Sequence, residues 1–366
     1  MKNSETVDTV HTHTHTHTGV VLKEKNRILY FDILNILACI SVIFLHCNGI
    51  VHTYSKIRAW NTSLIVEVIC YWAVPVFIML TGATLMNYRK KYDTKTFFKK
   101  RILKVCIPFI FWALFMIAWK NAIGKLYVEQ WSIQGILNIF FTNKEESIYY
   151  FMFIIIGIYL TLPILSILAE NKYRKVLWYI VIGMFITKST LPVILNIFNI
   201  EYNNYLTILL DGYIIFVVLG YLLSTMELKK KQRALIYILG ITSCILRYCV
   251  TYFLSTRDQK INKLLFGYTQ FHSVFLAVAV FVFIKNVNWN KIINKEKLTN
   301  TLSKISGCSF GIYLIHKIVM YYEQLIFNIN VYSAIWRTIG AVITYLICLV
   351  LVMILKKLPI LKRVVP

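Results

Sequence analysis

Residues 29–47 read LYFDILNILACISVIFLHC, an apolar run broken by a few polar side chains such as Asp32, Asn35 and His46. A helix needs about 20 mostly apolar residues to cross the hydrocarbon core of a bilayer, because every backbone polar group must be satisfied within the segment. The run is therefore predicted to span a membrane as one helix, with Asp32 near its start and His46 near its end.

The same criterion, applied along the whole chain, predicts an all-α, polytopic integral membrane protein with about ten transmembrane helices. Residues 27–366 form this single membrane domain, and residues 1–26 are expected to be a disordered, His/Thr-rich cytoplasmic tail. The histidines of HTHTHTHT, at every second position of that tail, could instead bind a metal ion weakly. The predicted spans are 29–47, 64–86, 102–120, 149–169, 176–197, 206–224, 235–253, 265–284, 309–327 and 335–355.

Composition excludes several classes of protein. Apolar residues make up 58% of the chain and charged residues 15%, whereas soluble proteins carry about 45–50% and roughly 25%. The net charge of +24 comes from basic residues between apolar runs, so it predicts a lipid bilayer as partner and no nucleic acid. The eight cysteines form no CxxC pair, so neither a disulfide framework nor a metal site is expected.

The connecting segments predict the orientation. With both termini in the cytoplasm, cytoplasmic segments hold 26 of the 40 Lys and Arg residues, counting only Lys23, Lys25 and Arg27 before the first span, and outer segments hold nine. Cytoplasmic loops of membrane proteins carry this excess of positive charge. The count therefore favours an even number of spans with both termini inside.

Ionisable groups inside a bilayer are costly, so each one is a candidate for function. Histidine exchanges protons near neutral pH, and His46, His272 and His316 lie in or beside predicted spans. His46 is expected toward the outer leaflet as a reactive group; the alternative is a histidine that hydrogen-bonds a neighbouring helix. Asp211 is a further candidate, because its short side chain cannot reach water along a helix.

Long basic side chains have a simpler explanation. Arg247, Lys317 and Arg337 are interpreted as snorkelling, with the charge at the membrane interface.

Residues 87–108, NYRKKYDTKTFFKKRILKVCIP, form a basic stretch before the third predicted span. Arg101 and Lys104 are three residues apart, which places them on one face of an α-helix where they would clamp a phosphate, with Lys100 beside them. The alternative is ordinary cytoplasmic charge or attraction to acidic lipid.

Six stretches together resemble the acyltransferase 3 family of bacterial integral membrane enzymes. They are RILYFDILNILACISVIFLH (27–46), VPVFIMLTGATLM (74–86), FFKKRILKVCIPFIFW (97–112), YYFMFIIIGIYLTLPIL (149–165), GYIIFVVLGYLL (212–223) and SFGIYLIH (309–316). The resemblance implies a ten-span core in the bacterial cytoplasmic membrane. It also implies transfer of an acyl group, commonly acetyl, from acyl-CoA to a hydroxyl of a cell-surface or exported polysaccharide.

The resemblance also assigns residues. In the first span the family has an Arg followed, after ten residues, by a His; His46 matches the histidine, and Asn35 stands in place of the arginine. Arg101 and Lys104 occupy the positions of two arginines separated by two residues, although Lys lacks the planar bidentate contact of Arg. Tyr313 and His316 match the family.

The fourth span departs from the family pattern. The family's His-Leu-Trp-like opening is replaced by residues 148–150, Ile-Tyr-Tyr. Tyr150 is nevertheless expected in the substrate cavity, together with Tyr313 and Asp211.

The implied mechanism brings acyl-CoA from the cytoplasm to Arg101, Lys104 and Lys100, with His46 as general base, His316 in the same cavity and no metal. Asp32 orients groups or stabilises charge on the first span, about 21 Å along the helix from His46. The acceptor is a cell-surface or lipid-linked glycan.

Two other functions compete with this one. The first is a non-catalytic glycan transporter or exporter, or a degenerate family member. The presence of Asn35 in place of the family arginine makes this alternative plausible. A receptor or channel has less support, because no Asp/Glu ring or Gly-rich filter is visible.

Overall fold

The computed structural model describes residues 28–126, 128, 131–203, 205–293, 296–359 and 361–365. All regular secondary structure in these ranges is helical, which confirms the predicted all-α class. The predicted His/Thr-rich tail lies outside the described residues. The helices are α1 (Leu29–Cys47), α2 (Arg58–Cys70), α3 (Ala73–Leu85), α4 (Thr94–Arg101), α5 (Ile107–Ala122), α6 (Ile133–Phe141), α7 (Tyr150–Leu165), α8 (Arg174–Met184), α9 (Leu191–Ile197), α10 (Ile214–Thr225), α11 (Lys230–Asp258), α12 (Phe271–Asn286), α13 (Trp289–Ile292), α14 (Glu296–Ser306), α15 (Ser309–Ile326) and α16 (Ala341–Leu355).

Long apolar helices dominate the fold, so the chain is a multi-pass membrane protein. Within the described residues, seven helical stretches are long and apolar enough to cross a bilayer. The other three predicted spans coincide with α10, α12 and α15, which have 12, 16 and 18 residues. The total of ten spans and the cytoplasmic termini remain predictions. The seven stretches are Leu29–Cys47, Arg58–Lys90, Thr94–Ala122, Ser147–Leu168, Asn171–Ile197, Lys230–Asp258 and Trp336–Leu355.

Prolines account for two irregular turns. The π-helical turns Ile102–Cys106 and Phe185–Thr190 end two residues before Pro108 and Pro192, respectively. A proline inside a helix has no N–H to donate and its ring clashes with the carbonyl four residues earlier, so a wider turn relieves the contact. The first of these turns joins α4 to α5 and shifts the faces of the two helices relative to each other.

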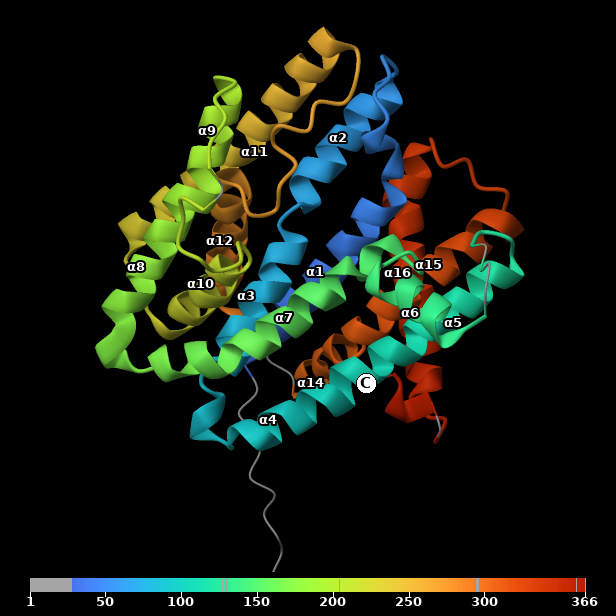
Figure 1. Ribbon diagram of the computed structural model, residues 1–366, viewed down its shortest axis with the longest axis horizontal. Coiled ribbons are helices and arrows are strands. Elements are labelled where there is room, and N and C mark those ends of the chain that lie inside the picture. The colour runs from blue at the N-terminus through green and yellow to red at the C-terminus, as the bar shows by residue number, and fades with distance from the viewer. Residues whose placement is uncertain are drawn as a thin grey trace, which may run out of the picture.

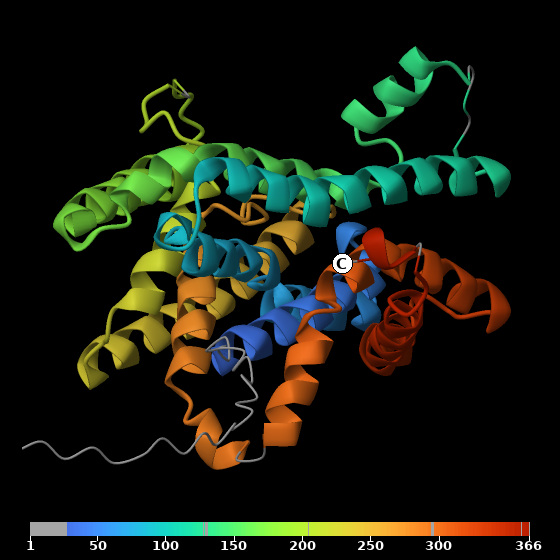
Figure 2. The same ribbon diagram turned by 90° about the horizontal axis from the view of Figure 1, so that it is seen from below.

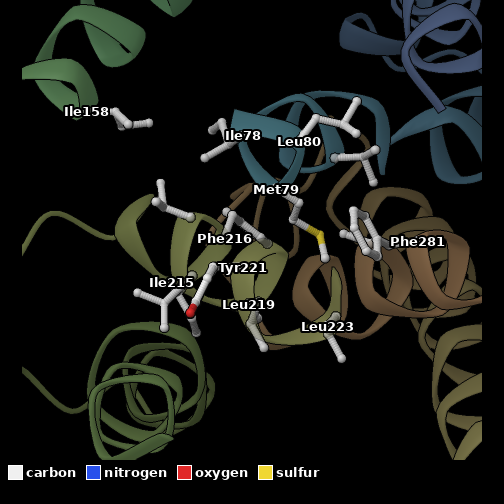
Figure 3. Close-up of a cluster of buried hydrophobic side chains, with 14 of the residues drawn as sticks. Ile78, Met79, Leu80, Ile158, Ile215, Phe216, Leu219, Tyr221, Leu223 and Phe281 are labelled. Atoms are coloured by element: carbon white, nitrogen blue, oxygen red, sulfur yellow. The ribbon is translucent and has the colours of Figure 1, made fainter. Parts of the chain in front are cut away.

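Two glycines let α3 and α10 cross at close range. A Cβ atom added at Gly82 would collide with the backbone carbonyl of Val217, and one added at Gly220 would collide with that of Met79. Small residues allow such close approach in membrane proteins, where packing rather than the hydrophobic effect drives helix association. Around this crossing, Met79 of α3 lies near Phe281 of α12 in a buried apolar cluster (Figure 3).

The apolar core has two main parts, both of which include residues of α1, and a third, small cluster around Trp60 of α2. One part is built mainly around α3, α10 and α12, and the other around α5, α15 and α16. Figure 1 shows α10 and α12 on one side of α1 and α5, α15 and α16 on the other, with α7 running alongside α4 and α5. Figure 2, turned by 90°, shows α5 and α7 still side by side. The two parts meet where α1, α3, α7 and α15 face one another, and the cavity described next opens at this seam.

Candidate active site

A cavity of about 310 Å³ lies between α1, α3, α7 and α15. One end is walled by Tyr159 of α7, Ser306 of α14 and Gly307; we call this the basic end, because Arg101 and Lys356 lie beside it, as described below. The other end is walled by His46 and by three tyrosines, and we call it the histidine end. Its tyrosines are Tyr150, Tyr268 and Tyr313.

One face of α1 connects the two ends. Asn35, Val42 and His46 all line the cavity. Their spacings of seven and four residues keep them on one side of an α-helix. Because an α-helix rises 1.5 Å per residue, Asn35 and His46 lie about 16 Å apart along the axis. The cavity therefore extends across roughly half of a hydrocarbon core.

The two candidate histidines form a direct pair. Nδ1 of His46 lies 2.7 Å from Nε2 of His316, and the two rings are nearly parallel and meet edge to edge, with 4.8 Å between their centroids. His316 is completely buried, whereas His46 is half-buried and lines the cavity. Nδ1 of His316 lies 2.8 Å from the carbonyl oxygen of Tyr313, one turn earlier in α15.

These contacts determine where the protons lie in the neutral pair. A carbonyl oxygen only accepts, so Nδ1 of His316 must carry the hydrogen and donate it to Tyr313. Nε2 of a neutral His316 is then an acceptor, and Nδ1 of His46 must be the donor to it. Nε2 of His46 is left with a free lone pair. His46 is thereby set up to take a proton from a molecule in the cavity, with His316 holding its tautomer.

An aromatic stack supports the histidine end from behind. The ring of Tyr268 stacks on that of Tyr71 at 4.2 Å, and the guanidinium carbon of Arg247 lies 3.4 Å from the centroid of Tyr71. Arg247 also lies 3.4 Å from the Glu67 carboxylate and donates from Nε to the Leu265 carbonyl oxygen at 2.9 Å. A cation on an aromatic face with a buried counter-ion fixes the ring. Arg247 therefore holds the wall of the cavity.

The snorkelling interpretation is wrong for two of the three basic residues. Arg247 and Arg337 are only 1% and 2% exposed. Arg337 donates to the Tyr332 carbonyl oxygen and to the Thr62 hydroxyl, each at 2.8 Å, so hydrogen bonds within the protein replace water. Lys317 is half-buried.

Asn35 has a structural partner at the basic end. Its amide nitrogen donates to the Ser306 carbonyl oxygen at 2.8 Å and to the Ser306 hydroxyl at 2.9 Å. The side chain thus joins α1 to the end of α14, just before α15 begins. Asn35 is neutral and presents its amide to the cavity.

The basic cluster is arranged differently from the prediction. Arg101 ends α4, with its guanidinium carbon 5.6 Å from the ring centroid of Tyr159, a cavity residue. Lys104 falls in the π-helical turn and is exposed. Arg101 is half-buried, whereas Lys104 is exposed and is not among the residues that line the cavity. Lys100 lies over the ring of Tyr92, with 3.8 Å between Nζ and the ring centroid.

Two predicted carboxylates lie away from the cavity wall. Asp32 is buried in the first turn of α1. Asp211 is exposed and accepts a hydrogen bond at 2.9 Å from the backbone N–H of Tyr213, so it stabilises the turn that leads into α10. Asp211, which was predicted in the substrate cavity, is not among the residues that line the cavity described here.

Among the wall residues that were not singled out from the sequence are Tyr159, Tyr268 and Ser306. Tyr159 lies within the singled-out stretch 149–165, and Ser306 lies three residues before the stretch 309–316, whereas Tyr268 is in a loop with no motif. Within the described part of the chain, no group of three His, Cys, Asp or Glu side chains is arranged to hold a metal ion.

Comparison with known proteins identifies one family. The model of the acyltransferase 3 family, described as an acyltransferase domain, matches residues 28–355. No curated protein and no solved structure matches the chain. The match begins just before α1 and ends at the last residue of α16, so it includes the whole cavity.

Proposed function

The chain belongs to the acyltransferase 3 family and is a membrane acyltransferase, and from this premise we propose that it transfers an acyl group from acyl-CoA to a hydroxyl of a polysaccharide. The donor enters at the basic end from the cytoplasm, and the acceptor is a cell-surface, exported or lipid-linked glycan. The acyl group is proposed to be acetyl, and the membrane is the bacterial cytoplasmic membrane. The observation that carries this proposal is the histidine pair, whose His46 lines a cavity with basic residues beside its other end.

The acyl-CoA donor is bound through its phosphate groups and through its pantetheine arm. Arg101 attracts the phosphates, with Lys100 and Lys104 adding positive charge nearby. The pantetheine arm follows the face of α1 past Asn35, whose amide oxygen is free to accept from the amide groups of the arm. The thioester then reaches the histidine end, about 16 Å further along α1.

The chemical step uses the free lone pair of His46. Nε2 of His46 takes the proton of the acceptor hydroxyl as its oxygen attacks the thioester carbonyl. The carbon–oxygen bond forms, the carbon–sulfur bond breaks, and the same proton passes from His46 to the departing thiolate to give free CoA. General-base catalysis of this kind contributes roughly 10²- to 10⁴-fold in rate.

His316 stabilises the cation that forms on His46. When Nε2 of His46 is protonated, its Nδ1–H still donates to Nε2 of His316, and that bond now has a charged donor. His316 keeps its own hydrogen on the Tyr313 carbonyl oxygen throughout. Asp32 is about 21 Å along α1 from His46 and is too far away to take this role.

A glycan transporter or degenerate enzyme remains the competing hypothesis, because Asn35 lacks the charge of the arginine it replaces. The two are distinguished by mass spectrometry of surface polysaccharide from cells that express the wild type, His46→Gln or His52→Gln. His52 is an exposed histidine outside the cavity wall and serves as the matched control.

We expect the mass of one acyl group per modified sugar with the wild type and His52→Gln, and its loss with His46→Gln. Free thiol released from acyl-CoA by the purified protein should follow the same order. Equal acylation by His46→Gln and wild type would remove the proposed role of His46. Polysaccharide that is exported without any acyl group would favour transport.

A further inference from the structure

Lys356 lies beside the basic end of the cavity. It directly follows α16, and its Nζ donates to the Gly307 carbonyl oxygen at 2.7 Å. Gly307 lines the cavity next to Ser306, the residue that Asn35 holds. A positive charge is therefore attached to the backbone of the cavity wall, from a part of the sequence in which no motif was recognised.

The chain after α16 is packed, which keeps Lys356 in place. Nε1 of Trp112 in α5 donates to the Val364 carbonyl oxygen at 2.9 Å, and Val365 is only 1% exposed. A Cβ atom added at Gly311 of α15 would press on both Val352 and Val365. The segment is thus held against α5 and α15.

Arg101 faces the same end of the cavity from the opposite wall. Its guanidinium lies over Tyr159, and its Nε is buried without a hydrogen-bond acceptor among the described residues. Figures 1 and 2 show α4, α14 and the C-terminal end of the chain on one face of the molecule. Burying a charged donor without a partner is costly, so the arrangement favours an anionic ligand.

Both cations have donors to spare. An ammonium group has three N–H donors, and the Gly307 carbonyl oxygen uses one of those on Lys356. In the described ranges, no salt bridge joins either Lys356 or Arg101 to a carboxylate. Lys104, by contrast, is exposed on the π-helical turn and is not part of the cavity wall.

We propose that Lys356 and Arg101 together bind the phosphate groups of the acyl-CoA donor, with Lys356 as the second cation in place of Lys104. This inference rests on the proposed function. The remaining N–H groups of Lys356 donate to phosphate oxygens, while Arg101 binds from the α4 side. The donor is therefore held across the basic end, with its arm directed along α1 toward His46.

The test compares Lys356→Gln with Lys357→Gln in the full-length purified protein. Lys357 is the exposed neighbour and controls for the loss of one charge at the membrane surface. A hydrogen bond to a charged group contributes about 1.5–3 kcal/mol, so Lys356→Gln should raise the KM for acetyl-CoA roughly 10-fold or more. Its kcat should change less than about twofold, and Lys356→Arg should restore most of the affinity.

Binding of CoA alone, measured by calorimetry, provides a readout that needs no acceptor and no turnover. We expect weaker binding by Lys356→Gln than by Lys357→Gln and the wild type. A Lys356→Gln protein that binds CoA and acetyl-CoA as the wild type does overturns this inference but leaves the proposed function intact. A wild type that neither binds nor consumes acyl-CoA overturns both.

Discussion

Replacing His316 by leucine tests the proton arrangement of the histidine pair. Leucine removes the acceptor for Nδ1–H of His46 and leaves that nitrogen without its bond of 2.7 Å. The lost bond is worth most when His46 is protonated in the transition state, because a hydrogen bond to a charged group contributes about 1.5–3 kcal/mol. Each 1.36 kcal/mol is a factor of ten in rate, so kcat should fall roughly 10- to 150-fold.

Glutamine at the same position is the matched control. Its amide oxygen can accept from Nδ1–H of His46 and its amide nitrogen can donate to the Tyr313 carbonyl oxygen, as His316 does. His316→Gln should therefore lose less activity than His316→Leu. The assay is the initial rate of CoA release from acetyl-CoA by purified protein, followed with a thiol reagent.

The double variant His46→Ala/His316→Leu makes the result decisive. If His316 acts only through His46, the double variant should be no slower than His46→Ala alone, because residues that act as a unit are not additive. The assignment of protons in the pair would be refuted if the rate losses of the two single variants multiplied in the double variant. It would also be refuted if His316→Leu were as fast as His316→Gln.

Two further predictions concern stability. Gly220→Ala should lower the free energy of unfolding by about 1–3 kcal/mol, because the new Cβ collides with the backbone of Met79. Gly157→Ala is the control and should have no such effect, because a Cβ there meets nothing within 4 Å. Thermal unfolding in detergent measures both variants, and equal melting temperatures would refute the prediction. Burial raises the pKa of Glu145 from 4.5 to about 7, so the folded state binds this proton more tightly than the unfolded state, and stability should fall as pH rises from about 4.5 to about 7. Glu145→Gln should therefore melt above the wild type at pH 8, with the gap closing toward pH 5, whereas a change at the exposed Glu201 should have no such pH dependence.

Much of the fold could be predicted, because the bilayer imposes a simple rule on the sequence. Each predicted span overlaps at least one helix, since backbone groups in lipid must be satisfied within the segment. The same rule cannot distinguish a snorkelling arginine from a buried one. Arg247 depends on Glu67, which is far away in the sequence and belongs to another helix.

The candidate site was predictable only where the relevant residues share a motif. His46 and His316 were singled out, but their contact depends on how α1 packs against α15, which neither stretch encodes alone. The expected face shared by Arg101 and Lys104 assumed a regular α-helix, whereas a π-helical turn begins directly after Arg101 and includes Lys104. For Lys356, nothing in the sequence indicated a place at the site other than the charge of the side chain.

The π-helical turn at Ile102–Cys106 has a consequence for comparing this chain with others of its family. Hydrogen bonds that skip one more residue than in an α-helix accommodate one additional residue between α4 and α5. A homologue with a regular helix at this place would be one residue shorter, and an alignment drawn without a gap would pair Arg101 with the wrong position. Any transfer of donor-binding residues between such proteins should therefore be anchored separately on each side of Pro108.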